Sequence, residues 1–334
     1  MQETITPDQT QAPRADRSLR DYLGIMLRGV CMGASDIVPG VSGGTMAFIL
    51  GIYEELINSI RAVGQPPFLQ ALFRFRIKEI FQILNWQFLL AVATGIFLAI
   101  LTLSQGLEWL LINHPIIIWS FFFGLVLASV YVVSKRIENW TPDLIMLLVV
   151  GTLGAYLLVG LVPVQTPEDW WFLILSGALA ICAMILPGIS GAFILVLLGK
   201  YQFILSAVNQ RDIVTIALVG IGAIIGLITF AQILGWLFKR YHNMMVALLT
   251  GLMLGSLRRV WPWKEDVAWL QDGMGMYVLD SHGDRVVTQQ LNMLPDLASS
   301  AGLTEFGIAI LLFSVGLGAI LLLDRLAGDK LQTT

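Results

Sequence analysis

Two copies of a Pro-Gly-x-Ser-Gly motif are the part of this sequence best suited to chemistry. Residues 39–53 read PGVSGGTMAFILGIY and residues 187–201 read PGISGAFILVLLGKY, and the two align without gaps at an offset of 148. A proline ends an incoming helix, and a glycine-rich start of the next helix leaves backbone N–H groups available to an anion. We therefore predict a site for a phosphate-sized anion from the small and hydroxyl-bearing residues of both copies: Ser35, Gly40, Ser42, Gly43, Gly44, Thr45, Gly188, Ser190 and Gly191.

Charged residues flank both motifs. We expect Arg28 and Lys200 to compensate the charge of the anion, and Asp36 or Glu54 to take up a proton. Ionisable groups at membrane depth are costly and commonly mark a pathway, an ion pair or a proton relay. Plainer alternatives stay open: an Arg28–Asp36 ion pair, a Glu54 solvated at headgroup level, and a motif that merely lets two helices turn and pack.

Composition sets the class of protein that must position these residues. The chain has 334 residues, of which 57% are hydrophobic and 13% are charged, against about 25% charged in a soluble domain. Apolar runs of about 20 residues are the length that a bilayer demands of a helix. The sequence thus predicts an all-α polytopic membrane protein whose helical segments are 20–36, 41–60, 88–107, 116–134, 144–163, 170–186, 189–207, 212–238, 241–257 and 306–323.

The net charge of −3 argues against nucleic acid as a partner, because no cationic excess is present. Cys31 and Cys182 both lie in apolar stretches, where we interpret them as packing residues. Two cysteines are too few for a cysteine-rich metal site, and we expect neither a metal nor a cofactor.

The repeated motif divides the chain into two related halves, a common organisation of transporters. Each half has five helical pieces, or three membrane crossings if the first two pieces form a re-entrant hairpin. Either number is odd, which predicts two inverted-topology repeats. We favour a re-entrant hairpin plus about three transmembrane helices per repeat. The predicted boundaries are a disordered cytoplasmic tail 1–19, a first repeat 20–163 with an amphipathic insertion 61–87, a second repeat 164–325 with an extracytoplasmic loop 261–304, and a cytoplasmic tail 326–334.

The distribution of Lys and Arg predicts the orientation, because short cytoplasmic loops are enriched in both. A cytoplasmic N-terminus collects thirteen of the 20 on the inside: Arg14, Arg17, Arg20, Arg61, Arg74, Arg76, Lys78, Lys135, Arg136, Lys239, Arg240, Arg325 and Lys330. We therefore expect both termini in the cytoplasm. Within the outer loop, residues 276–287 read MYVLDSHGDRVV and predict a small β-hairpin. Glycine pairs four residues apart predict close helix packing at Gly222 and Gly226, and at Gly251 and Gly255.

The segments GASDIVPGVSGGTMAFILGIYEELI (33–57) and LPGISGAFILVLLGKY (186–201) carry a resemblance to a known family. The chain resembles the bacterial and archaeal polyprenyl-phosphate transporters over residues 20–325. This resemblance implies import of undecaprenyl phosphate, the lipid carrier of cell-wall synthesis, from the outer to the cytoplasmic leaflet of the bacterial inner membrane. It implies polyprenyl phosphate and membrane lipids as partners, and a transporter rather than an enzyme.

Two other functions remain open at this point. An integral-membrane polyprenyl pyrophosphate phosphatase would use similar tips, but it requires an Arg beside the Ser and a Glu/His pair for phosphoryl chemistry. Here Gly43 follows Ser42 and Gly191 follows Ser190. A carrier of a small soluble anion could use the same helix N-termini. Proton coupling through Asp36 or Glu54 is our hypothesis for the energy source.

Overall fold

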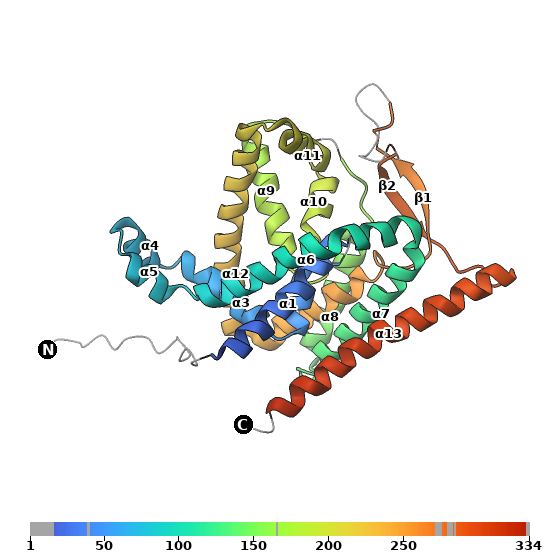
Figure 1. The fold of residues 1–334 in the computed structure, drawn as a ribbon, viewed down its shortest axis with the longest axis horizontal. Helices are drawn as coiled ribbons and strands as arrows, with labels where there is room; N and C mark the ends of the chain where they lie inside the picture. Colours follow the sequence, from blue (N-terminus) through green and yellow to red (C-terminus); the bar gives the residue numbers. More distant parts are fainter. Residues whose placement is uncertain are drawn as a thin grey trace.

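The computed structural model describes residues 17–38, 41–164, 166–270, 276–278, 283 and 285–331, with the side chains of 326–331 left out. Most of these residues are helical (Figure 1). The elements, in chain order, are α1 (Leu19–Ile37), α2 (Gly43–Ile49), α3 (Tyr53–Val63), α4 (Pro66–Phe73), α5 (Ile77–Ile83), α6 (Trp86–Asn113), α7 (Pro115–Ser134), α8 (Pro142–Leu158), α9 (Trp170–Ile185), α10 (Gly191–Leu197), α11 (Tyr201–Gln210), α12 (Ile213–Ser256), β1 (Lys264–Trp269), β2 (Val287–Asn292) and α13 (Ser300–Leu331).

Within the described part of the chain, four helices, α6, α7, α12 and α13, are long and apolar enough to cross a membrane. A fifth crossing is possible if α10 and α11, which are bent by 105° from each other, count as one span. The apolar helices α8 and α9 are shorter, with 17 and 16 residues. Helix α12 has 44 residues because two predicted segments, 212–238 and 241–257, continue into each other across non-helical backbone at Tyr241. A helical, multi-pass fold is thus confirmed.

Both halves pack their helices in matching pairs, and glycines allow the contact. In the first half α1 lies along α6, and in the second half α9 lies along α12. The remaining pairs join the halves, since α7 packs on α13 and α8 packs on the later part of α12. The predicted packing glycines are confirmed: Gly222 and Gly226 face the backbone of α9, and Gly251 and Gly255 face that of α8. At these positions a Cβ would collide with backbone atoms of the neighbouring helix.

The returning arm of each hairpin is broken, which corrects the uninterrupted helices predicted for 41–60 and 189–207. Gly51 ends α2 at φ +73° and Gly199 ends α10 at φ +63°. Each break has the two reverse hydrogen bonds of a Schellman motif, such as Ile52 N–H to Ala47 C=O at 3.0 Å and Lys200 N–H to Leu195 C=O at 2.8 Å. Glycine adopts this left-handed conformation without steric cost, so each copy of Leu-Gly-x-Tyr stops its helix.

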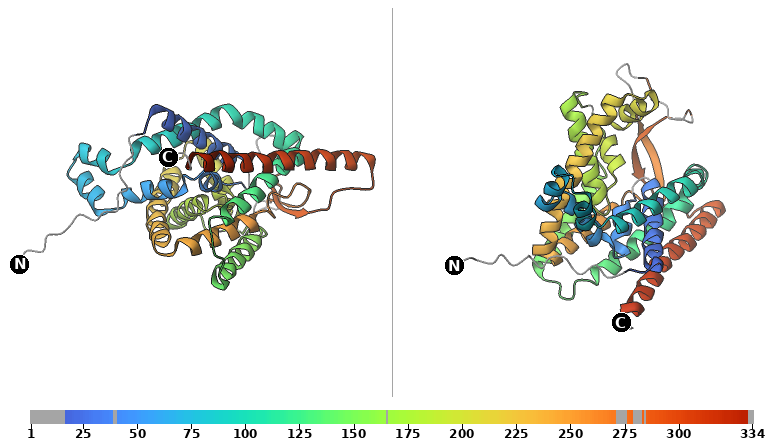
Figure 2. Two further views of the ribbon diagram at one scale, coloured as in Figure 1. Left: turned by 90° about the horizontal axis from the view of Figure 1, so that it is seen from below. Right: turned by 60° about the vertical axis from the view of Figure 1, so that its left-hand side comes forward.

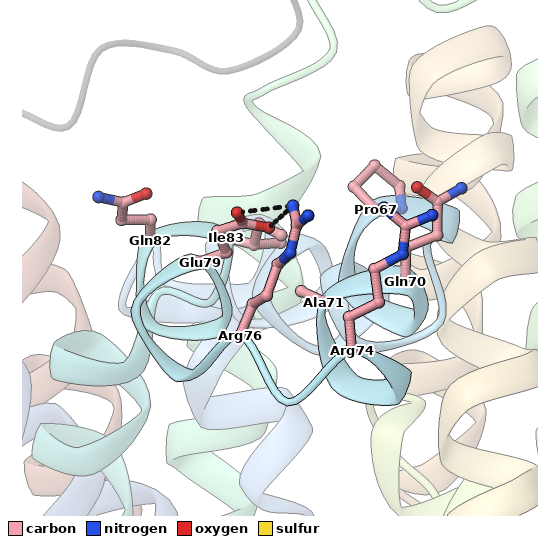
Figure 3. Close-up of a pocket in the computed structure, with 8 residues that line it drawn as sticks. All are labelled: Pro67, Gln70, Ala71, Arg74, Arg76, Glu79, Gln82 and Ile83. Carbon is pink, nitrogen blue, oxygen red and sulfur yellow. Dashed lines mark hydrogen bonds and ion pairs between the residues drawn. The ribbon is translucent and has the colours of Figure 1, made fainter.

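The insertion and the outer loop also differ in detail from their predictions. The amphipathic insertion is two short helices, α4 and α5, joined at Phe75, which has a φ of 52° and is 87% exposed. A shallow pocket between them contains Arg74 and Arg76, and Arg76 is paired with Glu79 at 3.0 Å (Figure 3). The β-hairpin pairs β1 with β2, so its strands flank most of the predicted segment 276–287. The middle of that segment is mostly outside the described residues.

The two ends of the described chain lie on the same side of the molecule. The first turns of α1 and the last turns of α13 lie toward the lower left of Figure 1, and the β-hairpin lies at the upper right. Both further views in Figure 2 preserve this separation. Helices α9 and α10 enter the centre from the end of the molecule that carries α11.

Candidate functional site

The two predicted motifs meet in the interior. Helix α1 ends at Ile37, and Ser42 starts α2 as its N-cap residue; α9 ends at Ile185, and Ser190 starts α10 in the same way. We name residues 38–42 the first tip and residues 186–190 the second tip. Pro39 and Gly40 of the first tip lie outside the described residues. The tips are 148 residues apart in sequence and touch each other in the fold.

Hydrogen bonds join the two halves at this contact. The Thr45 hydroxyl, on the first turn of α2, accepts from the Gly188 backbone N–H at 2.8 Å. The Ser42 hydroxyl lies 3.3 Å from the Met184 carbonyl and 3.4 Å from that of Leu186. Ser42 and Thr45 are both 1% exposed. Because buried polar groups need partners, these bonds set the distance between the tips.

The backbones of the two halves approach closely at Gly44. A Cβ at this position would lie 2.6 Å from the Ile185 carbonyl oxygen and 3.1 Å from that of Met184. Gly188 has a φ of +88°, and a Cβ there would meet Leu252 and Ser256 of α12. Glycine is therefore required at both positions by space, and at Gly188 also by backbone conformation.

Asp36 occupies the N-terminus of α2 that was predicted to be free. Its Oδ1 accepts from the Gly43 backbone N–H at 2.7 Å, while the Ser42 hydroxyl accepts from the Gly44 N–H at 3.1 Å. A carboxylate is favourable at this position because the helix dipole and the orphan N–H groups are directed at it. The alternative of an Arg28–Asp36 ion pair is wrong among the residues that the structure describes.

The second tip is organised differently from the first. Ser190 makes no side-chain cap on α10 and is partly exposed. Gly191 packs on α9, where a Cβ would lie 2.6 Å from the Ala180 carbonyl oxygen. Ser35 is buried in the last turn of α1, one turn before the first tip. The predicted motif residues in the described ranges are thus gathered around the tips.

The three predicted charged residues Arg28, Lys200 and Glu54 are not at the tips. Arg28 is exposed on α1, about 12 Å before Asp36 along the helix. Lys200 is 2% exposed at the far end of α10, where its ammonium donates to the Thr166 carbonyl at 2.8 Å. Glu54 pairs with His242 at 3.0 Å, with both side chains 47% exposed. Their roles in anion binding and proton transfer stay predictions.

We expect Thr45→Val to loosen the contact between the halves. Valine keeps the shape of threonine but leaves the buried Gly188 N–H without its acceptor, which costs about 1–3 kcal/mol of stability. Thermal unfolding of the full chain in detergent should show a lower midpoint. Thr45→Ser keeps the hydroxyl and should restore most of the loss. Equal unfolding of the valine and serine variants would contradict this role.

Sequence analysis missed two cations on the segment after α12, Arg259 and Lys264. The Arg259 Nε and the Lys264 Nζ are buried, and neither has a hydrogen-bond partner among the described residues. The Arg259 guanidinium lies 5.4 Å from the centre of the Phe193 ring on α10. The backbone N–H of Arg259 donates to the Ser256 carbonyl, and the Ser256 side chain neighbours Gly188. The sequence carries a faint signal, a cluster of basic residues directly after an apolar helix, but not the burial.

Chemically, the tips offer hydroxyls, a carboxylate and close backbone contact, and Arg259 lies against the ring of Phe193 on α10. Within the described ranges, no cluster of three or more His, Cys, Asp or Glu side chains could hold a metal ion. The N–H groups of Gly43, Gly44 and Gly188 already donate to Asp36, Ser42 and Thr45, so anion binding at the tips stays a prediction.

Comparison with known proteins identifies the group to which this arrangement belongs. Residues 32–278 match the model of the undecaprenyl phosphate translocase-like family. The polyprenyl-phosphate transporter of Vibrio cholerae is 44% identical over 277 residues, covering 82% of this chain and 86% of that protein. The polyprenyl-phosphate transporter of Staphylococcus aureus is 30% identical over 256 residues, covering 71% and 85%. No solved structure matches the chain. This multi-pass membrane protein, with its two motifs brought together at one contact, belongs to the undecaprenyl phosphate translocase-like family.

Proposed function

We propose that the protein carries polyprenyl phosphate, undecaprenyl phosphate in particular, from the outer to the cytoplasmic leaflet. The contact between the two tips, through Thr45 and Gly188, is the observation that carries the proposal. A lipid phosphate cannot cross about 30 Å of hydrocarbon without shelter for its charge. Polar backbone in the interior of an apolar helical protein provides such shelter and is tolerated where protein surrounds it. The names of the relatives support the substrate.

In this proposal the two hairpins are re-entrant and belong to inverted repeats, 20–163 and 164–325. The repeated order of a long helix, a seven-residue helix and a third helix supports the duplication, as do the matching Schellman breaks. The first turns of α1 and the last turns of α13 lie on one side of the molecule, which supports a common face for the two termini. We assign this face to the cytoplasmic side of the inner membrane. Alternate opening of the tip contact toward each face would then move the headgroup.

Proteoliposomes containing fluorescent undecaprenyl phosphate provide the test. We expect the full chain to move label from the outer leaflet, so that a membrane-impermeant quencher no longer reaches it. The rate of this protection should be higher under a pH gradient than without one. Release of inorganic phosphate from undecaprenyl pyrophosphate is measured in parallel. Phosphate release without lipid movement would replace the proposal with a phosphatase, and movement of free phosphate alone would replace it with a small-anion carrier.

A further inference from the structure

Lys264, the first residue of β1, is partly buried and holds its ammonium nitrogen in the interior. Its Nζ lies 3.7 Å from the centre of the Trp119 ring on α7 and has no hydrogen-bond acceptor in the described ranges. Burial and the charge of Arg259 lower the pKa of Lys264 to about 7, against the opposing effect of Asp266. Asp266 itself is exposed and accepts from Gln290 at 2.7 Å. Among the described residues, Asp266 attracts this ammonium group electrostatically, but no acceptor forms a hydrogen bond with it.

Arg259 shares this lack. Its Nε is also buried without a described partner, and Phe193 of α10 lies beneath its guanidinium group. Two adjacent buried cations repel each other, and isolated buried charges are costly. Such a pair lowers the stability of the protein. An incoming anion with several acceptor oxygens would offset this cost by accepting hydrogen bonds from both cations.

An apolar groove is lined by residues 261–263, which lie between the two cations in the sequence. It encloses about 170 Å³ between α7, α13 and the segment after α12, and its lining residues are Ser120, Phe123, Trp261, Pro262, Trp263, Phe306, Ala309, Ile310 and Phe313. The rings form a continuous cluster, with Phe123 5.4 Å from Trp261 and Trp263 5.8 Å from Phe306. Ile310 is 49% exposed, so the groove opens on the outer surface of α13.

The groove and Lys264 are built on the same two elements. On α7, Trp119 touches Lys264 and the next residue, Ser120, lines the groove. After α12, Trp261 and Trp263 line the groove and are directly followed by Lys264. A ligand that fits both parts has an anionic head joined to an apolar chain.

We propose that Arg259 and Lys264 receive the phosphate of the polyprenyl lipid before it reaches the tips, while the adjoining isoprene units lie in the aromatic groove. This loading site rests on the proposed function, since it takes the same lipid on the face that carries the β-hairpin. Arg259 connects this site to the second hairpin, because its guanidinium group lies 5.4 Å from the centre of the Phe193 ring on α10.

Binding of radiolabelled undecaprenyl phosphate to the full chain in nanodiscs tests the head of the site. We expect Lys264→Gln and Arg259→Gln to weaken binding about tenfold each, the effect of losing one charged hydrogen bond. The affinity for undecaprenol, which lacks the phosphate, should be unchanged in both variants when it is measured by competition. Replacing a buried unpaired cation by a neutral side chain removes a desolvation cost, so the variants should fold. Arg285→Gln, on the same loop but exposed beside Tyr277, is the matched control.

Filling the groove tests its chain-binding part. Ile310→Trp places a large ring at the groove mouth and should weaken binding of both undecaprenyl phosphate and undecaprenol. Leu311→Trp, at a neighbouring exposed position of α13 outside the groove, should weaken neither. Equal effects of the two tryptophans would show that the groove does not hold the isoprene chain, and would overturn the proposal.

The pH dependence of lipid binding distinguishes binding of the phosphate by the Lys264 charge from a merely structural role of Lys264. Above pH 7 the phosphate is already a dianion, because its second pKa is about 6. Further weakening of binding from pH 7 to 9 then follows deprotonation of Lys264, and Lys264→Arg should flatten it. Unchanged binding by both glutamine variants would refute the loading site even if the lipid is transported. Tight, phosphate-dependent binding without any leaflet movement would instead refute the proposed function and retain the site.

Discussion

Gly44→Val is expected to abolish transport and to destabilise the protein. A Cβ at Gly44 would lie 2.6 Å from the Ile185 carbonyl oxygen, and valine adds two methyl groups beyond it. The opposing atoms belong to the backbone at the end of α9, directly before the second tip, so no side chain can rotate away. Overpacking of this kind costs about 1–3 kcal/mol, and more where the backbone must shift. The tips would be forced apart, and the bond between Thr45 and Gly188 would be lost with them.

The leaflet-resolved assay and thermal unfolding together check this result. Gly24→Val is the matched control, because Gly24 lies on α1 and a Cβ there would meet nothing within 4 Å. We expect the control to insert, unfold and transport much as the unmodified chain does. A Gly44→Val protein with full transport would show that close contact of the tips is dispensable.

Asp36→Asn is expected to remove the dependence of transport on a pH gradient. Asparagine keeps an oxygen that accepts from the Gly43 N–H, so the start of α2 should stay in place. It cannot exchange a proton, and a carrier coupled through this carboxyl would lose its driving force. Initial rates with and without an imposed gradient should become equal, at or below the uncoupled rate of the unmodified protein.

Two variants separate coupling from structure. Asp36→Leu also removes the acceptor, and should lower the unfolding midpoint where Asp36→Asn does not. Glu54→Gln alters the other predicted proton acceptor, which is half exposed and paired with His242. We expect it to keep the gradient response. Loss of the response in Glu54→Gln, but not in Asp36→Asn, would transfer the coupling role to Glu54.

Several features of the fold and site could be predicted from sequence because they are local or repeated. Long apolar runs define the helices, and the offset of 148 identifies two equivalent motifs, whose meeting in space is then a natural expectation. Small residues spaced by four, such as Gly222 and Gly226, predict contact with another helix. The partner helix does not follow from that spacing, since it depends on how the whole chain is arranged.

Other features depend on side-chain orientation and long-range packing, which cannot be predicted from a single sequence. Lys200 follows the second motif directly, yet the Schellman break at Gly199 turns it to the far end of α10. Arg28 and Asp36 are eight residues apart on one helix, too far for an ion pair. Lys264 is an ordinary loop lysine in the sequence, and its burial arises from Trp119, which is 145 residues earlier.

The bonds between the tips also have a consequence for biosynthesis. The Thr45 hydroxyl finds its donor in Gly188, and the Ser42 hydroxyl finds acceptors at Met184 and Leu186. These partners are translated about 140 residues later, after the helices that lie between. In the proposed re-entrant arrangement these groups lie within the membrane, where polar groups lacking partners are costly, so we expect the first hairpin to reach its final depth only together with the second. We therefore expect insertion to include a joint docking step, in which the later hairpin completes the earlier one.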